Sequence, residues 1–490
     1  MHTTHSKGKA ERIMIVVWDG MRPDLVSPAN TPHLWGLAQR GVTFSDNHSC
    51  FPTLTRLNSA SISTGAYPRT HGLMGNTVLV PELNPTRGIS TGDYENLIRF
   101  DQVTDGHLLT TDTLAQMVVK AGGTTAVASS CSTGAAFLLN HKLDGWIVNH
   151  SYILPDPLSR TIKAQFGTAP EPTYPNTGRN VYAIRVLTEY ILREIKPTLI
   201  YVWLSDPDHT QHAYGPGAPT SMEAIQRVDA HLGDILSALD KFDLRDSTNL
   251  FVLSDHGFVT QEQPVNLSEI LIDAGLKRAK ESTDVICVDT HIYVQDHDIE
   301  KIRGIVAFLQ EQEWCGPIFT RHHKDRDANL GQIEGTLSMK LIGNDHPRGG
   351  DILYSYAWNA KANRWGVRGT TAGGSGAGHG CISPFELKTM LFAAGPDFKS
   401  GVISQVPSGN IDVAMTALDL LGIQPSGKHD GRVLREGLLD GPEPQEIYFR
   451  KEHIRAQKRS NGFCLETLVQ ISTVGETWYL DKGSTLTMSN

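Results

Sequence analysis

The chain has 490 residues, enough for one large α/β domain that carries insertions. Its 53 acidic and 44 basic residues give a net charge of −9 without long runs of one sign, which argues against nucleic-acid polymers and anionic membranes as partners. Six widely separated cysteines do not make a disulfide framework, so we expect reduced and mostly buried thiols.

The amino-terminal segment, MHTTHSKGKAER, is polar, and the apolar run IMIVVW that follows it ends at Asp19. This run is too short for the apolar part of a signal peptide or for a membrane span. We therefore predict a cytoplasmic location. A secreted protein trimmed of its leader would show the same sequence.

Apolar runs rich in β-branched residues alternate with amphipathic stretches in the first half of the chain. The strand-like runs are IMIVVW (13–18), TTAVASS (124–130), TLIYVWLS (198–205) and NLFVLSDHG (249–257). The helix-like stretches are 31–41, 111–122, 181–195 and 221–242. Strands that alternate with helices predict an α/β fold with a mostly parallel sheet flanked by helices.

This rhythm changes after residue 260. A strand-like run, VICVDTHIYV (285–294), is followed by the helix-like IEKIRGIVAFLQEQEW (299–314) and by the polar HHKDRD (322–327), which we interpret as solvated surface. The main pattern resumes with KTMLFAAGPDF (388–398) and the helix-like NIDVAMTALDLLGI (410–423). We therefore predict a catalytic core in two parts (10–260 and 371–445), an inserted cap (261–370) and C-terminal strands (446–490).

Three strand-like runs each lead into an acidic residue, namely Asp19, Asp208 and Asp255. One aspartate beside a turn would usually only end a strand. Ligands of open parallel sheets, however, bind outside the carboxyl ends of the strands, so these three carboxylates should converge on one crevice.

Imidazoles accompany these carboxylates. His212 follows Asp208 by four residues, one helical turn away if the segment is helical, and His256 follows Asp255 directly. Carboxylate and imidazole so placed suit a divalent cation. His379 lies in GGSGAGHG, a glycine-rich loop flexible enough to bring an imidazole to a distant site, and this loop lacks the Lys-Ser/Thr of a P-loop.

Together with the stretch CFPTLTRLNSASISTGAYPRTHGLMGN (50–76), these six residues resemble the alkaline phosphatase superfamily, and within it the nucleotide pyrophosphatase/phosphodiesterase branch. The resemblance covers most of the chain, through VVWDGMRPD, FPTLT, STGAYPRTHGLMGN, SDPDHTQHAYGP, SDHGF and GHG in order. It implies an alkaline-phosphatase-like fold and two divalent metal ions, zinc by the family pattern. When the family's motifs are matched to this sequence, the resemblance implies that one metal is bound by Asp19, Asp255, His256 and Thr55. The other is bound by Asp208, His212 and His379.

The register of the 50–76 stretch distinguishes the candidate nucleophiles. In sulfatases of this superfamily, the modified Cys or Ser is the first residue of the motif C/S-x-P-x-R and stands nine positions before a Thr-Gly pair. Thr55 stands nine residues before Thr64, whereas Cys50 stands fourteen before it and is followed by Leu54 where arginine is required. Thr53 fits the threonine that precedes the nucleophile in the family. The resemblance therefore implies Thr55 as the nucleophile.

The implied reaction is hydrolysis of a phosphodiester, or of a nucleotide pyrophosphate, in a small phosphorylated substrate through a phosphothreonine. Asn76 fits the asparagine whose amide donates to a phosphoryl oxygen in this branch. Nucleotide-cleaving members usually carry an aromatic residue directly after the nucleophile, and this chain has Arg56. Arg56 either binds an anionic part of the substrate or pairs with a surface carboxylate.

Three alternatives stay open. A phosphonoacetate hydrolase shares the six ligands and the threonine, and Arg56 would suit its carboxylated substrate. That branch, however, usually has asparagine after the nucleophile, and this chain has no paired lysines just downstream of Gly75-Asn76. A phosphomonoesterase would need more cationic contacts for a third phosphoryl oxygen. A non-catalytic, metal-stabilised binding protein is the third. The sequence leaves the leaving group, the metals bound in vivo and the oligomeric state open.

Overall fold

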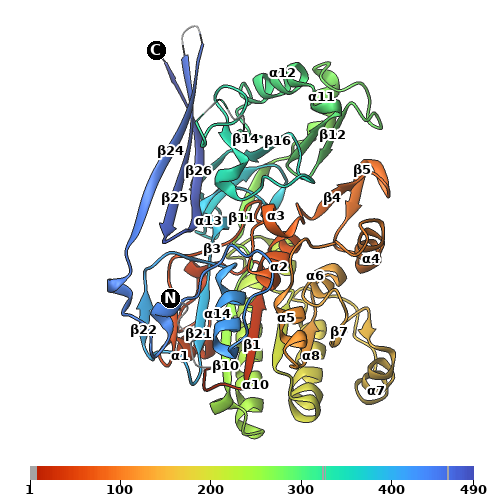
Figure 1. Ribbon diagram of the computed structural model, residues 1–490, viewed down its shortest axis with the longest axis vertical. Coiled ribbons are helices and arrows are strands. Elements are labelled where there is room, and N and C mark those ends of the chain that lie inside the picture. Colours follow the sequence, from red (N-terminus) through yellow and green to blue (C-terminus); the bar gives the residue numbers. More distant parts are fainter. Residues whose placement is uncertain (1–7, 323–324, 326, 461–462, 490) are drawn as a thin grey trace.

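The computed structural model describes residues 8–489 except 323–324, 326 and 461–462 (Figure 1). Its largest element is a nine-stranded sheet. The strands run in the order β22 (Val402–Ser404), β2 (Val42–Phe44), β21 (Leu391–Ala394), β10 (Thr248–Leu253), β1 (Arg12–Trp18), β9 (Leu199–Leu204), β6 (Thr125–Ser129), β7 (Trp146–Asn149) and β8 (Ile153–Leu154). The five central strands from β10 to β7 are mutually parallel, whereas β21 and β8 run antiparallel to their neighbours. The prediction of a mostly parallel α/β sheet is confirmed.

Helices cover both faces of this sheet. Every residue of β1 is buried, which explains why its sequence is a continuous apolar run and not an alternating one. Ile13, Ile15 and Val17 pack with α5 (Leu114–Lys120), α6 (Thr133–Leu138) and α14 (Asp412–Leu421). Met14, Val16 and Trp18 pack on the other face with α1 (Pro32–Ala38), α8 (Thr177–Val186) and α10 (Pro219–Lys241).

A second, five-stranded sheet lies in the segment that we predicted as a cap. Its order is β12 (Val285–Val288), β13 (His291–Val294), β16 (Ile352–Tyr356), β14 (Cys315–Thr320) and β15 (Leu337–Ser338), and α11 (Leu267–Asp273) and α12 (Ile299–Leu309) pack against it. The run 285–294 is two strands and not one. Its chain reverses at Asp289, whose φ of 49° is a left-handed conformation that aspartate tolerates. The boundaries of the cap stay a prediction.

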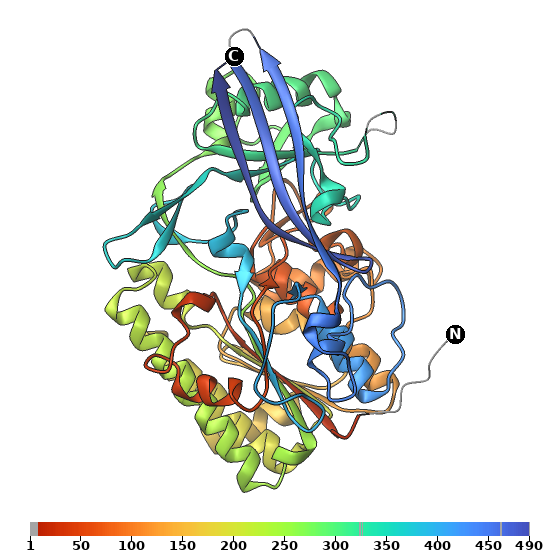
Figure 2. The same cartoon turned by 90° about the vertical axis from the view of Figure 1, so that its left-hand side faces the viewer.

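The chain ends in a three-stranded antiparallel sheet of long strands, β24 (Phe449–Ser460), β25 (Phe463–Val474) and β26 (Thr477–Ser489). These strands run past both the core and the five-stranded sheet (Figure 2). Val469 and Leu480 pack with Phe319 of the five-stranded sheet, while Tyr479 packs with Leu57 of the core. The C-terminal sheet therefore joins the two parts. Among the described residues, no helix is long and apolar enough to cross a bilayer.

Candidate active site

Thr55 is the first residue of α2 (Thr55–Thr64) and is buried. Its Oγ1 lies 3.1 Å from Nε2 of His256. The helix ends at Gly65, whose φ of 66° is the left-handed conformation that glycine adopts readily. Two residues before Thr55, Thr53 accepts a hydrogen bond from Gly380 N and donates to the carbonyl of Cys381, so it anchors the His379 segment.

Cys50 is not a competitor for the role of nucleophile. The thiol is 2% exposed, and burial raises the pKa of Cys50 to about 12. A thiol in that state carries almost no thiolate near neutral pH, and the thiolate is the reactive form.

Three oxygen atoms converge on Nε2 of His256. Besides Thr55 Oγ1, Oδ2 of Asp255 lies 3.2 Å away and Oδ1 of Asp19 lies 3.4 Å away. His256 Nδ1 donates to the carbonyl of Gly257 at 2.9 Å, which fixes the ring with Nε2 toward these oxygens. Asp19 follows β1 and Asp255 follows the adjacent β10, so their convergence comes from the parallel pairing of these strands.

The electrostatics of this cluster favour positive charge. Burial raises the pKa of Asp255 well above its usual value, and the nearby Asp19 adds to the effect. Burial would lower the pKa of His256, but Asp255 and Asp19 outweigh it and raise that pKa to about 10. Carboxylates packed this closely are stable together only when a proton or a cation lies among them.

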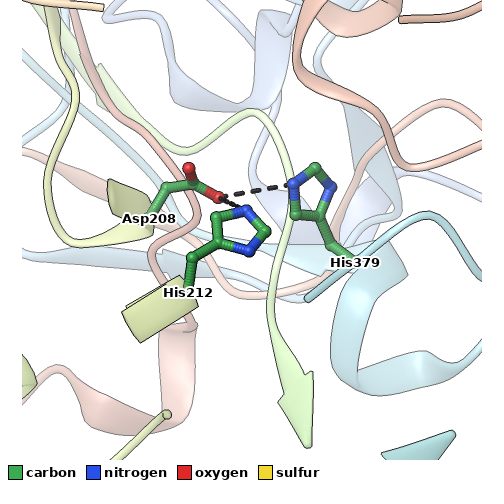
Figure 3. Close-up of side chains that lie close together, drawn as sticks. All are labelled: Asp208, His212 and His379. Carbon is green, nitrogen blue, oxygen red and sulfur yellow. Dashed lines mark ion pairs between the residues drawn. The ribbon is translucent and has the colours of Figure 1, made fainter. Parts of the chain in front are cut away.

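A second cluster joins Asp208, His212 and His379 (Figure 3). The segment after β9 is helical, as α9 (Asp208–Tyr214), so Asp208 and His212 share one face. Oδ1 of Asp208 lies 3.3 Å from Nε2 of His212 and 3.4 Å from Nε2 of His379. Part of the glycine-rich run that we expected to be a loop is a strand, β19 (Gly376–Gly378), which pairs with β11 (Val259–Gln263) and carries His379 at its end.

Both imidazoles are oriented by backbone carbonyls. His379 Nδ1 donates to Thr53 O at 2.7 Å, and His212 Nδ1 lies 3.3 Å from Ala377 O. Burial, followed by the charges of His256 and His212, lowers the pKa of His379 well below its usual value. His379 is therefore held as the neutral ring, which is the form that binds a metal.

The two clusters suit divalent cations, because three of their carboxylate oxygens have no hydrogen-bond donor among the described residues. Oδ1 of Asp19, Oδ1 of Asp208 and Oδ2 of Asp255 are buried and have no hydrogen-bond partner in the described part of the chain. Buried carboxylate oxygens without donors are costly unless a cation compensates them. Atoms of Asp208, His212 and His379 lie within 4.8 Å of one another, as do atoms of Asp19, Asp208 and His256. Asp208 thus belongs to both groups, and Asp255 lies beside the second.

The residues that hold Asp19 and Asp255 in place were not predicted from the sequence. Oδ2 of Asp19 accepts hydrogen bonds from Trp203 Nε1 and from Cys131 Sγ, both at 3.0 Å. The carbonyl of Asp255 accepts from Ser49 and Asn410. No local pattern marks these partners, because their role depends on which strands and loops become neighbours.

Asn76 and Arg56 lie beside the nucleophile. Arg56 N donates to Oδ1 of Asn76 at 3.0 Å, so the oxygen of that amide is engaged and its NH₂ group is turned away from Arg56 N. The Arg56 side chain is partly buried, and its Nε has no hydrogen-bond partner among the described residues. No described carboxylate forms an ion pair with Arg56, which argues against a surface ion pair as its role.

A third cluster, Asp46, His48 and Asp481, has metal-like spacing but already contains a cation. Lys388 Nζ lies 2.7 Å from His48 Nε2 and 3.3 Å from Asp481 Oδ1, and it also contacts Asp46. The cluster is therefore an ion-pair network that ties β26 to the core. In the HHKDRD run, His322 is partly exposed and Asp325 and Asp327 are exposed, while 323, 324 and 326 lie outside the described residues.

The fold is that of the alkaline phosphatases. Alkaline phosphatase PafA superimposes with a TM-score of 0.68 at 15% identity, over 88% of this chain and all of that one. An inactive variant of murine ectonucleotide pyrophosphatase/phosphodiesterase 5, solved with AMP, superimposes with a TM-score of 0.61 at 17% identity, over 87% of this chain and 99% of that one.

The sequence model of the type I phosphodiesterase/nucleotide pyrophosphatase family matches residues 13–337, and the chain belongs to this family. An ectonucleotide pyrophosphatase/phosphodiesterase of Caenorhabditis elegans is 23% identical over 86% of this chain and 44% of its own length. Human ectonucleotide pyrophosphatase/phosphodiesterase family member 1 is 24% identical over 88% of this chain and 42% of its own. The chain thus spans less than half the length of these two relatives.

Proposed function

We propose that the protein is a metal-dependent hydrolase that cleaves phosphodiester bonds, including nucleotide pyrophosphate bonds, with Thr55 as the nucleophile. The observation that carries this proposal is the contact of 3.1 Å between Thr55 Oγ1 and His256 Nε2, within a buried set of carboxylates and imidazoles. Membership of the phosphodiesterase family supports it. The murine relative solved with AMP is a threonine-to-alanine variant described as inactive, which also favours a threonine nucleophile.

In the proposed reaction, Thr55 Oγ1 attacks phosphorus in line with the departing oxygen. The Oγ1–H proton passes to solvent water, a bond from Oγ1 to phosphorus forms, and the bond to the leaving oxygen breaks with its electron pair going to that oxygen. The product is a phosphothreonine, which water then hydrolyses to restore the hydroxyl. Two divalent cations, when bound, would favour the ionised hydroxyl and stabilise negative charge on the departing oxygen.

Asn76 and the start of α2 would stabilise the phosphoryl oxygens. Because Oδ1 of Asn76 accepts from Arg56 N, its NH₂ group is the part available to a substrate oxygen. Thr55 is the first residue of α2, where backbone N–H groups lack acceptors within the helix and favour an anion.

The cations would be held by Asp208, His212 and His379 on one side and by Asp19, Asp255, His256 and Thr55 on the other. A mixed set of imidazole nitrogens and carboxylate oxygens suits zinc. His379, held neutral, needs no deprotonation before it binds.

The proposed substrates are small phosphodiesters. A diester carries one negative charge at phosphorus and a second substituent, and Arg56, which has no described carboxylate partner, could receive an anionic part of that substituent. The relatives include a bis(5'-adenosyl)-triphosphatase of Mus musculus, 24% identical over 51% of this chain and 48% of its own length. A dinucleotide is therefore a suitable test substrate.

The decisive experiment compares four substrates on the zinc-loaded enzyme, namely a p-nitrophenyl phosphodiester, the matching monoester, a dinucleotide and phosphonoacetate. We expect the diesters to have the higher kcat/KM. A preference for the monoester would indicate a phosphatase, and release of phosphate from phosphonoacetate would indicate a carbon–phosphorus hydrolase.

A further inference from the structure

Asp289, at the tip of the β12–β13 hairpin, reaches the backbone beside Asn76. Its Oδ2 accepts a hydrogen bond from Thr77 N at 2.8 Å. Thr77 directly follows Asn76 and begins β4 (Thr77–Val80). A Cβ on Gly75 would lie only 2.5 Å from the same Oδ2, so the absence of a side chain at position 75 permits this approach.

A second hydrogen bond links Asn76 to the residue that follows the nucleophile. Asn76 Oδ1 accepts from the backbone N–H of Arg56, the residue after Thr55. Desolvation of the Asp289 carboxyl raises its pKa, whereas the backbone N–H of Thr77, the charge of Arg56 and the backbone N–H of Asn76 lower it. Asp289 is thus coupled to Asn76 and its neighbours, although it lies more than two hundred positions further along the chain.

The segment that carries Asn76 is held from two sides. Thr91 donates to the Asn76 carbonyl through its backbone N–H at 2.9 Å and through its hydroxyl at 2.7 Å, and Asp289 holds the amide of the next residue, Thr77. Among the described strands, β4 pairs only with β5 (Asn84–Ser90), in a two-stranded sheet separate from the nine-stranded one. Figure 1 shows this hairpin at the edge of the molecule, and β5 lies against β12. Asp289 is thus the contact through which the β12–β13 hairpin supports the backbone directly after Asn76, beside the support that Thr91 gives to Asn76 itself.

We propose that Asp289 is a positioning residue for Asn76, through which the β12–β13 hairpin holds the Asn76 amide toward the substrate's phosphoryl oxygen. The proposal rests on the proposed function, in which Asn76 donates to that oxygen. Asp289 touches no reacting atom. It acts by holding the Thr77 amide, and hence the backbone that carries Asn76.

A double-mutant cycle tests this coupling. We expect Asp289→Ala to lower kcat for a phosphodiester by about tenfold, with a smaller change in KM, because a misplaced donor stabilises the transition state less well. Asp289→Asn keeps an acceptor oxygen for Thr77 N and should recover part of the loss. In an Asn76→Ala background, Asp289→Ala should have an effect of no more than about twofold. Multiplicative losses in the double variant would overturn the proposal.

Gly75→Ala gives an independent test, because its methyl group would push the Asp289 carboxylate away. It should reproduce the loss caused by Asp289→Ala. When the two substitutions are combined, Gly75→Ala should add little, because no carboxylate then remains to be displaced. A further large loss in the combined variant would show that Gly75 acts on Asn76 independently of Asp289, and would contradict the proposal.

Glu281 provides a matched control. It is an acidic residue that also bonds to the β4–β5 hairpin, through Arg87 Nε at 2.8 Å and Thr86 Oγ1 at 3.2 Å, but on β5 and not at the amide that follows Asn76. Glu281→Ala should leave kcat unchanged.

Amide hydrogen exchange separates this inference from the proposed function. In Asp289→Ala, the peptide that covers 73–80 should exchange faster than in the wild type, in Asp289→Asn and in Glu281→Ala. This result would stand even if the wild type cleaved none of the test substrates. Unchanged exchange, or an equal increase in Glu281→Ala, would show that Asp289 does not hold this segment.

Discussion

Oγ1 of Thr55 lies 3.1 Å from Nε2 of His256, although 201 positions separate the two residues in the chain. The contact brings the start of α2 to the end of β10, where Asp255 and Asp19 also end adjacent parallel strands. A hydroxyl at a helix start and an imidazole among carboxylates are ordinary features when they occur alone. Their contact among buried carboxylates supports the proposed nucleophile.

Substitution of Thr55 separates a covalent role from a packing role. We expect Thr55→Ala to lower kcat on the order of a thousandfold or more, because the attacking oxygen is lost. Cys50→Ala, which removes a nearby buried thiol, should change kcat little. Both variants are compared by steady-state kinetics on a p-nitrophenyl phosphodiester. An inactive Cys50→Ala beside an active Thr55→Ala would support the sulfatase-like chemistry instead.

The metal content tests the two clusters. The purified protein should bind close to two zinc-like ions per chain, and chelation should abolish activity reversibly. His379→Ala should lose one ion preferentially, because only two ligands, Asp208 and His212, then remain at that site. His48→Ala is the control, since His48 lies in the Lys388 network and should leave the metal content unchanged. Full activity in metal-free protein by elemental analysis would contradict the mechanism.

The sequence predicted the parts of the site that follow from strand ends. Asp19 and Asp255 end apolar runs, and His212 stands one helical turn after Asp208, so local patterns marked them as candidates, and the order of the family motifs joined them into one ligand set. Trp203 and Cys131 were not found, because their hydrogen bonds to Asp19 depend on the order of strands in the sheet. The register of β1 with β9 is a tertiary property that no local pattern encodes.

Outside the site, one prediction was wrong and one cluster was not found. The 285–294 run was predicted as one strand because its turn, at Asp289, contains neither glycine nor proline. Lys388, His48 and Asp481 come from three distant segments, so their ion-pair network had no sequence signature.

The Lys388 network predicts how stability depends on pH. Burial alone would raise the pKa of Asp481, but the hydrogen bond from His48 and the charges of His48 and Lys388 hold it well below the usual range. A carboxyl whose pKa is lowered by folding stabilises the protein above its unfolded pKa of about 3.9, and this contribution is lost as the pH falls toward the folded value.

We therefore expect Asp481→Asn to lower the free energy of unfolding at pH 7 by roughly 1–3 kcal/mol, and by less near pH 3. Chelated wild type and variant are compared by urea unfolding, so that loss of metal in acid does not contribute. Glu476→Gln, an exposed carboxyl in the turn of the same sheet, should show neither effect. A difference that is constant with pH would indicate packing and not ionisation.

Arg56 is the residue that we propose to distinguish between diesters, because it directly follows Thr55 and forms no ion pair with a described carboxylate. Arg56→Ala should weaken the transition-state binding of diesters with a second anionic group by roughly 1–3 kcal/mol, the range for a charge-assisted hydrogen bond, and leave neutral-tailed diesters nearly unchanged. Arg56→Lys should keep part of the preference, because it retains the charge but not the planar fork. The measurement is kcat/KM for matched pairs of substrates. Equal losses for both classes would mean that Arg56 supports α2 or Thr55, because only a contact with the second anionic group makes the loss depend on the substrate.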